Sequence, residues 1–412
     1  MDTQYTNVDE LINRLPEGYE KACFETKAIE RRREIKNPID LIKLCFLYLT
    51  GGYSLLEISV IALNLGIGKI NDVAFLKKFA KCQEWFSWMI SKIIPKPIIE
   101  YKVPKGLERY KITAIDASDV KEKGKSGRIF KLHYAIDLLK MCAANFKITT
   151  QKVGETLLNF DIGKDWLVLA DRAYGTIKSI EYCLKSQANF IIRLKYGAFK
   201  LYDQEGKEID LLAKLRDVTS DIATNIEVYA NLGSLGFTKL RVCTTKIPED
   251  RLDKVERKLK QSDSKKQRKT SKEALFMAKF VVVITALPDE ISADEIISLY
   301  RLRWQVEIYF KRLKSIIDFG NVPLRREDSI MTWLNGKLMI SLLIEQMISE
   351  VSFPPELTEN RSIWREIKLI YRMIRDNILS LGKLLSYFSS IAEILKIEKR
   401  KKLRKLQMTY TG

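Results

Sequence analysis

Four residues near position 300 have side chains and a spacing suited to phosphate chemistry. Tyr300, Arg303, Glu307 and Lys314 follow one another at intervals of three, four and seven residues. At about 100° per residue, an α-helix would place them within roughly 60° of one another around its axis. We therefore expect one helix, from Tyr300 to Lys314, that presents a carboxylate metal ligand between phosphate-binding groups, with Lys311 beside them.

An ordinary amphipathic helix with a solvated basic face is the plainer interpretation of this stretch. Its apolar residues, among them Val306 and Leu313, would pack on a core. A solvated face does not usually carry Tyr300 and Trp304 among its cations with a single acid. The rest of the chain has to decide between the two interpretations.

Two aspartates follow predicted strands earlier in the chain. The apolar run KITAIDASDV is expected to end as a strand at Asp116, and WLVLADRAYG at Asp171, before a turn at Gly175. Polar residues just past the ends of central strands are where active sites gather. With Glu307 these aspartates supply hard oxygen ligands for two Mg²⁺ about 4 Å apart, the arrangement that cleaves phosphodiesters. Arg303 and Lys314, from the same predicted helix as Glu307, would balance the charge that develops on the phosphate.

Composition favours a nucleic-acid partner. The chain has 412 residues, with 71 Lys and Arg against 52 Asp and Glu, so its formal charge is +19. Such an excess of positive charge suits a polyanion. No 18-residue apolar run and no secretory signal are present, so we expect no membrane partner and a cytoplasmic protein.

The cysteines and the single histidine exclude several chemistries. The six cysteines show no CxxC spacing, which argues against a zinc knuckle and a disulfide framework. Catalysis by Ser-His-Asp or Cys-His would have to use His133, which lies in the strand-like run KLHYAID. We expect this histidine to be structural.

The chain reads as five segments in an α/β arrangement with a mixed sheet flanked by helices. Helix signals dominate both ends. Ser54 with Glu57 is expected to form a capping box at a second helix, and Asn71 or Asp72 to cap a third helix that runs through Trp85. Ser292 is expected to cap a later helix near Glu295. The first three predicted helices resemble a helix-turn-helix. The expected domains are a helical DNA-binding domain (1–105), the first part of a catalytic domain (106–195), a β-containing insertion (196–280), the second catalytic part with the glutamate helix (281–325) and a helical C-terminal domain with a basic tail (326–412).

The spacing Y-x₂-R-x₃-E-x₆-K, in YRLRWQVEIYFKRLK, resembles the Y-R-E-K signature of bacterial cut-and-paste insertion-sequence transposases of the DDE class. The segments AIDASDV and ADRAYG, the latter followed by FIIRLK, look like the first and second aspartate regions of that family. The resemblance covers roughly residues 110–325 and implies a bacterial protein associated with the nucleoid. It implies a ribonuclease-H-like fold in which Asp116, Asp171 and Glu307 bind two Mg²⁺, for which Mn²⁺ would substitute.

The resemblance also implies an activity. Such enzymes cut double-stranded DNA at the element's ends, form a hairpin from the freed 3′-hydroxyl, and join the ends to target DNA as a homodimer in a synaptic complex. The family's stacking tryptophan is missing from residues 196–280, where Tyr202, Tyr229 or Phe237 could replace it. The residues predicted to contact DNA are Tyr300, Arg303, Lys311, Lys314, Arg193 and Lys195.

Two other functions fit the sequence. One is a ribonuclease-H-like endonuclease or resolvase that cuts without strand transfer. The other is a DNA-binding protein without catalytic activity, descended from a transposase. All three acidic positions are present, so the sequence gives no sign of an inactive site.

Overall fold

The structure is a computed structural model that describes residues 7–93, 95, 97, 103–122, 127, 129–218, 222–265, 267, 269–350 and 372. It divides into two compact units. The helical unit contains residues 1–100, 119–131 and 309–412, and the sheet unit contains residues 101–118 and 132–308. Apart from residue 372, the helices predicted beyond Glu350 and the basic tail lie outside the described residues.

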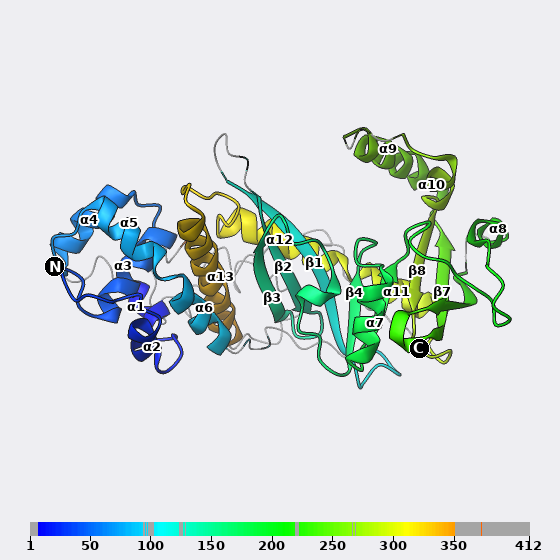
Figure 1. The fold of residues 1–412 in the computed structure, drawn as a ribbon, viewed down its shortest axis with the longest axis horizontal. Coiled ribbons are helices and arrows are strands. Elements are labelled where there is room, and N and C mark those ends of the chain that lie inside the picture. Colours follow the sequence, from blue (N-terminus) through cyan, green and yellow to red (C-terminus); the bar gives the residue numbers. More distant parts are fainter. Residues whose placement is uncertain are drawn as a thin grey trace, which may run out of the picture. The chain divides into compact units, whose positions relative to one another are not determined.

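One eight-stranded mixed sheet organises the sheet unit, as the sequence predicted. Its strand order is β3-β2-β1-β4-β5-β8-β7-β6, and Figure 1 shows β3, β2 and β1 side by side. The strands are β1 (Lys111–Lys121), β2 (Ile129–Asp137), β3 (Cys142–Thr150), β4 (Trp166–Ala170), β5 (Asn189–Arg193), β6 (Thr224–Asn231), β7 (Phe237–Lys246) and β8 (Phe280–Thr285).

Strand direction changes across this sheet. β4 pairs in parallel with both β1 and β5, whereas β5–β8, β8–β7 and β7–β6 are antiparallel pairs. All five residues of β4 are buried, as a parallel strand covered on both faces requires. The strands of the predicted insertion, β6 and β7, extend the same sheet beyond β8 and thereby cover an edge that would otherwise be unpaired.

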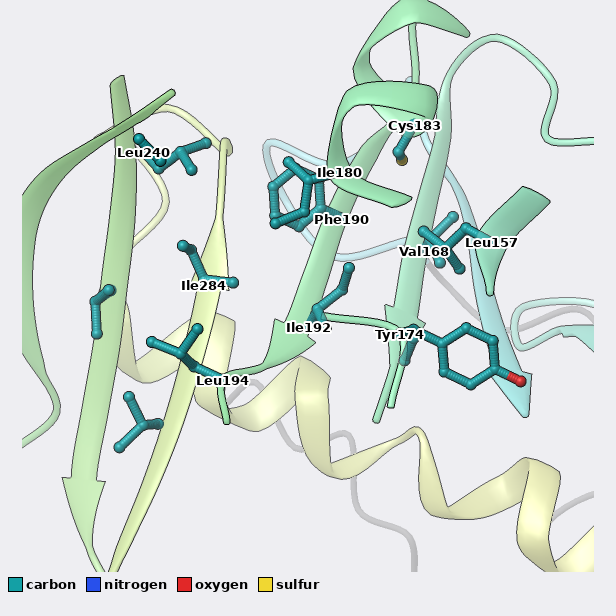
Figure 2. Close-up of a cluster of buried hydrophobic side chains, with 14 of the residues drawn as sticks. Leu157, Val168, Tyr174, Ile180, Cys183, Phe190, Ile192, Leu194, Leu240 and Ile284 are labelled. Atoms are coloured by element: carbon teal, nitrogen blue, oxygen red, sulfur yellow. The ribbon is translucent and has the colours of Figure 1, made fainter. Parts of the chain in front are cut away.

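One buried hydrophobic cluster includes side chains of β4, β5 and β8 and also of β7, a strand of the predicted insertion. Val168 of β4, Phe190 of β5, Ile284 of β8 and Leu240 of β7 belong to one buried cluster. Helix α7 (Ile177–Lys185) contributes Ile180 and Cys183 to the same cluster, as Figure 2 shows. The insertion is therefore held by shared apolar packing as well as by strand pairing.

The remaining helices of the sheet unit include one that leads to the predicted site. Ser292 caps helix α11 (Ala293–Arg301), as the sequence predicted. With Glu295 it forms a capping box, in which each side chain accepts a hydrogen bond from the other residue's backbone N–H. Helix α11 packs against strands β4 to β8. The other helical segments are α8 (Leu211–Arg216), α9 (Glu249–Lys265), α10 (Lys272–Met277) and the short turns η1 (Leu157–Asn159) and η2 (Gly233–Leu235).

A buried arginine joins the inserted strands to the start of α11. Arg241 of β7 is 4% exposed, and its guanidinium donates to the carbonyl oxygens of Leu287 at 3.2 Å and Ile291 at 3.0 Å. It also forms an ion pair with Asp289 at 3.1 Å. These contacts fix the connection from β8 to α11.

The helical unit gathers segments from both ends of the chain. A capping box of Ser54 and Glu57 starts α4, as predicted, but the predicted third helix to Trp85 is wrong because the chain turns at Lys81 and Cys82. The helices are α1 (Asn7–Ile12), α2 (Tyr19–Glu25), α3 (Pro38–Thr50), α4 (Leu55–Asn64), α5 (Asp72–Ala80), α6 (Gln83–Lys92) and α13 (Glu327–Glu350).

Helix α13 is the centre of the helical unit. It packs against α3, α5 and α6, and Trp333 meets Tyr48 edge-on at 5.2 Å between ring centroids. Gly336 permits a close approach, because a Cβ there would lie 2.5 Å from Leu49. No helix among the described residues is long and apolar enough to cross a membrane.

Lys337 of α13 is 2% exposed, and its ammonium donates to the carbonyl oxygen of Ile317 at 2.8 Å. Burial lowers the pKa of Lys337 to about 8, with Asp318 acting against this shift. The pKa of a lysine in an unfolded chain is about 10.4. Between about pH 8 and 10.4, the folded state therefore binds fewer protons at Lys337 than the unfolded state does. The contribution of Lys337 to the free energy of unfolding therefore rises with pH between about 8 and 10.4. Below about pH 8, the buried charge destabilises the folded state to its full extent.

We expect Lys337→Met to be more stable than the wild type at pH 7, by roughly 1–3 kcal/mol, because it removes a buried charge. This advantage should shrink as the pH rises from 8 to 10. Urea unfolding at several pH values, followed by Trp fluorescence, measures it, with the exposed Lys36→Met as control. A constant difference across that range would contradict the prediction.

Candidate active site

The two predicted aspartates come from neighbouring parallel strands. The register pairs Ala114 of β1 with Leu169 of β4, and Asp116 and Asp171 each follow two residues later. Adjacent strands are about 4.8 Å apart, which brings the two carboxylates to one edge of the sheet. The prediction that the first strand ends at Asp116 is wrong. β1 continues to Lys121, and only its parallel pairing with β4 stops before Asp116.

A tight turn holds Asp171 at the end of β4. Its carboxylate accepts a hydrogen bond from the backbone N–H of Ala173 at 2.8 Å, and its carbonyl accepts one from that of Tyr174 at 3.2 Å. Gly175 follows, where a Cβ would lie 3.3 Å from the carbonyl oxygen of Arg193. The side chain of Thr176 then caps α7.

The predicted unbroken helix from Tyr300 to Lys314 is wrong. α11 ends at Arg301 and α12 (Trp304–Ile316) begins three residues later. Between them the backbone tightens, because Arg303 N–H bonds the carbonyl of Tyr300 at 3.1 Å and Val306 N–H bonds that of Arg303 at 3.2 Å. These are the i to i−3 bonds of a 3₁₀ turn.

The turn places Arg303 between two predicted metal ligands. One guanidinium nitrogen lies 3.4 Å from a carboxylate oxygen of Asp116, and another forms a short ion pair with Glu307. The side chains of Arg303 and Asp116 are 14% and 17% exposed. A partly buried cation therefore joins the acid of β1 to the acid of α12.

Electrostatics in this cluster favour a cation. Burial raises the pKa of Asp116 to about 7, and the negative charges of Asp171 and Glu307 raise it further, against Arg303 and the N–H of Ala117. A divalent ion would offset both the burial and the repulsion. As they stand, no three His, Cys, Asp or Glu side chains of the described ranges are gathered closely enough to hold a metal. The guanidinium of Arg303 occupies two of the oxygens that such an ion would need.

The residues predicted to contact DNA fall into two groups. In the sheet unit, Tyr300 is 8% exposed and lies near enough to Arg303 for their charges to interact. Arg193 ends β5 partly buried, and Lys195 is exposed. In the helical unit, Lys311 is exposed and Lys314 donates to the carbonyl oxygen of Asp119 at 2.7 Å. Burial of Tyr300 makes it a support for Arg303 in this structure. DNA contact by these residues stays a prediction.

Three residues that were not singled out lie at the same edge. Arg172 follows Asp171 and is exposed, and its charge acts on Arg193. The hydroxyl of Tyr174 feels the charges of Asp116, Glu155 and Asp171. The motif ADRAYG contained the signal for Arg172 and Tyr174, whereas nothing in the sequence pointed to Glu155.

Comparison with known proteins decides the family. The family described as "Transposase DDE domain" matches residues 108–343, more than half of the chain. The chain belongs to the DDE transposases. It is thus a member of a family of metal-dependent DNA-cutting enzymes, and its mixed sheet flanked by helices agrees with the family's ribonuclease-H-like fold.

Several insertion-sequence proteins are similar over most of their length. The transposase for element IS421 of Escherichia coli is 27% identical over 353 residues, which are 82% of this chain and 93% of that protein. The protein named InsL, from element IS186A of Escherichia coli K12, shows the same identity and coverage. A shorter similarity links the chain to the transposase for element IS231F of Bacillus thuringiensis subsp. israelensis. The two are 26% identical over 156 residues, which are 38% of this chain and 32% of the IS231F protein.

We expect Arg303→Gln to bind Mn²⁺ more tightly than the wild type, by roughly 3- to 10-fold, because it removes a positive charge beside the site and frees oxygens of Asp116 and Glu307. DNA cleavage should nevertheless fall. Titration calorimetry with Mn²⁺ and a cleavage assay measure the two effects. Arg301→Gln, which removes an exposed cation two residues earlier, is the matched control. Weaker Mn²⁺ binding by the Arg303 variant would contradict the prediction.

Proposed function

We propose that this DDE transposase cuts a mobile element at its ends and joins the freed 3′-hydroxyl groups to target DNA. The single observation that carries the proposal is the link that Arg303 makes between Asp116 and Glu307, beside Asp171. Arg303 contacts an acid of a strand and an acid of a helix, and the negative charge of Asp171, in the turn after β4, acts on Asp116. The site thus combines oxygen ligands with a group that binds phosphate.

Asp116, Asp171 and Glu307 are the proposed holders of two Mg²⁺, which Mn²⁺ would replace. Bound there, the metal would activate the attacking oxygen and stabilise the leaving one. Asp116, on whose carboxylate the charges of both other acids act, is the residue proposed to serve two ions. Arg303 would release its carboxylate partners and turn to the phosphate, as Arg is well suited to do.

The cationic residues around the acids support the proposed DNA contacts. Arg193 and Arg172 lie at the ends of β5 and β4, close enough for their charges to act on each other. Lys195 adds an exposed charge just past β5. With a net charge of +19, the chain gains attraction to phosphates that does not depend on sequence. Double-stranded element ends and target DNA are the proposed partners, held by a homodimer.

An aromatic cluster on β6 and β7 supports a hairpin route. Tyr229 and Phe237 stack with their ring centroids 5.0 Å apart and their planes at 12°, and Tyr202 lies 6.0 Å from Phe237. Phe237 is 49% exposed. An exposed ring on a rigid strand can stack on a base that leaves the duplex, in place of the missing tryptophan.

Metal-dependent cleavage followed by joining distinguishes a transposase from an endonuclease or resolvase and from a DNA-binding protein without catalytic activity. We expect Glu307→Gln to lower both reactions more than roughly 100-fold, because it removes a charged metal ligand. The assay uses end-labelled DNA from the element's flanks with Mg²⁺. Glu290→Gln, which removes an exposed carboxylate in the same unit, is the control.

Each other result assigns a different function. Cleavage without joined products would favour an endonuclease or resolvase. DNA binding by the wild type without metal-dependent cutting would favour a DNA-binding protein. Full activity of Glu307→Gln would show that the proposed ligand set is wrong.

The hairpin step gives a separate prediction. Phe237→Ala should lower hairpin formation by roughly 10-fold, since base stacking on an aromatic ring is worth about 1–3 kcal/mol, and should leave the first nick unchanged. Denaturing gels of end-labelled DNA resolve the two products. Leu235→Ala, which shortens another exposed apolar side chain nearby, is the control. Equal loss in both variants would argue against a stacking role.

A further inference from the structure

The hydroxyl of Tyr174 is buried, and within the part of the chain that the structure describes no hydrogen bond compensates for its burial. Tyr174 is 0% exposed, and its hydroxyl oxygen has no hydrogen-bond partner among the described residues. Buried polar groups are nearly always paired. A phenylalanine would fill the same space without leaving a hydroxyl unpaired.

The position of Tyr174 ties this hydroxyl to the acids. The ring lies in the turn that follows Asp171, and its backbone N–H donates to the carbonyl of that aspartate at 3.2 Å. Phe160 packs against the ring at 6.4 Å between centroids. Figure 2 shows the hydroxyl pointing away from Ile192 and Leu194 of the apolar cluster. The backbone and the ring are thus fixed, and the hydroxyl is the part without a role.

The charges around the hydroxyl define what it can do. Burial raises the pKa of Tyr174, and the carboxylates of Asp116, Glu155 and Asp171 raise it further. A tyrosine hydroxyl carries a proton at neutral pH and is a hydrogen-bond donor. A donor among carboxylates suits oxygen atoms that gather around a cation, namely a ligating carboxylate or a bound water.

We propose that Tyr174 is a positioning residue whose hydroxyl donates a hydrogen bond to an oxygen ligand of the divalent metal. The inference rests on the proposed metal site of Asp116, Asp171 and Glu307. It adds to that site a donor that orients a ligand without itself touching the metal. Outer-shell partners of this kind affect metal affinity by roughly 10- to 100-fold.

Two variants of the full chain test the inference. Tyr174→Phe removes only the unpaired hydroxyl. Tyr182→Phe removes a hydroxyl that donates to the carbonyl oxygen of Phe160 at 2.8 Å, so it is a matched control with a satisfied hydrogen bond. The measurements are the Tm without metal and the affinity for Mn²⁺ alone by titration calorimetry.

The inference predicts opposite effects for Tyr174→Phe. Its Tm without metal should stay level or rise by about 2–4 °C, because an unpaired buried hydroxyl is lost. Its affinity for Mn²⁺ should fall by roughly tenfold or more. Tyr182→Phe should instead lower the Tm and leave Mn²⁺ binding unchanged. A purely structural role for Tyr174 would not weaken metal binding in a protein that is as stable as before.

An Asp171→Asn variant separates the two levels of the proposal. If it loses Mn²⁺ binding while Tyr174→Phe binds as tightly as the wild type, the role of Tyr174 is overturned and the metal site stands. If Asp171→Asn binds Mn²⁺ like the wild type, the proposed metal site is wrong and the inference is overturned with it.

Discussion

The repulsion among three neighbouring carboxylates is the constraint on which the site depends. Burial is the largest cause of the raised pKa of Asp116, and repulsion from the negative charges of Asp171 and Glu307 raises it further. In this structure the positive charge of Arg303 answers that repulsion by contacting two of the acids. Three local structures position these charged residues. The 3₁₀ turn between α11 and α12 positions Arg303, the parallel pairing of β1 with β4 positions Asp116, and the turn between β4 and the capped start of α7 positions Asp171.

Much of the architecture could be predicted, because it follows from patterns along the chain. Alternation of apolar strands and helices gave the mixed sheet, and Ser292 with Glu295 marked the start of α11. His133 is buried, with its Nε2 2.9 Å from the hydroxyl of Thr149, in keeping with the structural role expected of it. The absence of other histidines left acidic residues as the natural metal ligands.

The wrong predictions concern where helices and strands end and which side chains are buried. Both depend on contacts in three dimensions that the pattern of residues along the chain does not contain. A period of 3.6 residues does not reveal that Leu302 and Arg303 form a turn between two helices, and burial of Tyr300 depends on distant packing. The end of a strand depends on its neighbours. β1 runs past Asp116 although its pairing with β4 stops earlier, which sequence composition does not record.

The way in which β6 and β7 join the sheet sets a limit on how this enzyme can be shortened. A trimmed chain without them would expose the edge of β8, a surface prone to pairing with other molecules. It would also lose Arg241, and with it the hydrogen bonds that hold the connection leading into α11. A minimal catalytic domain would therefore have to keep the inserted strands, together with the turn between them, where Ser234 donates hydrogen bonds to Glu181 of α7.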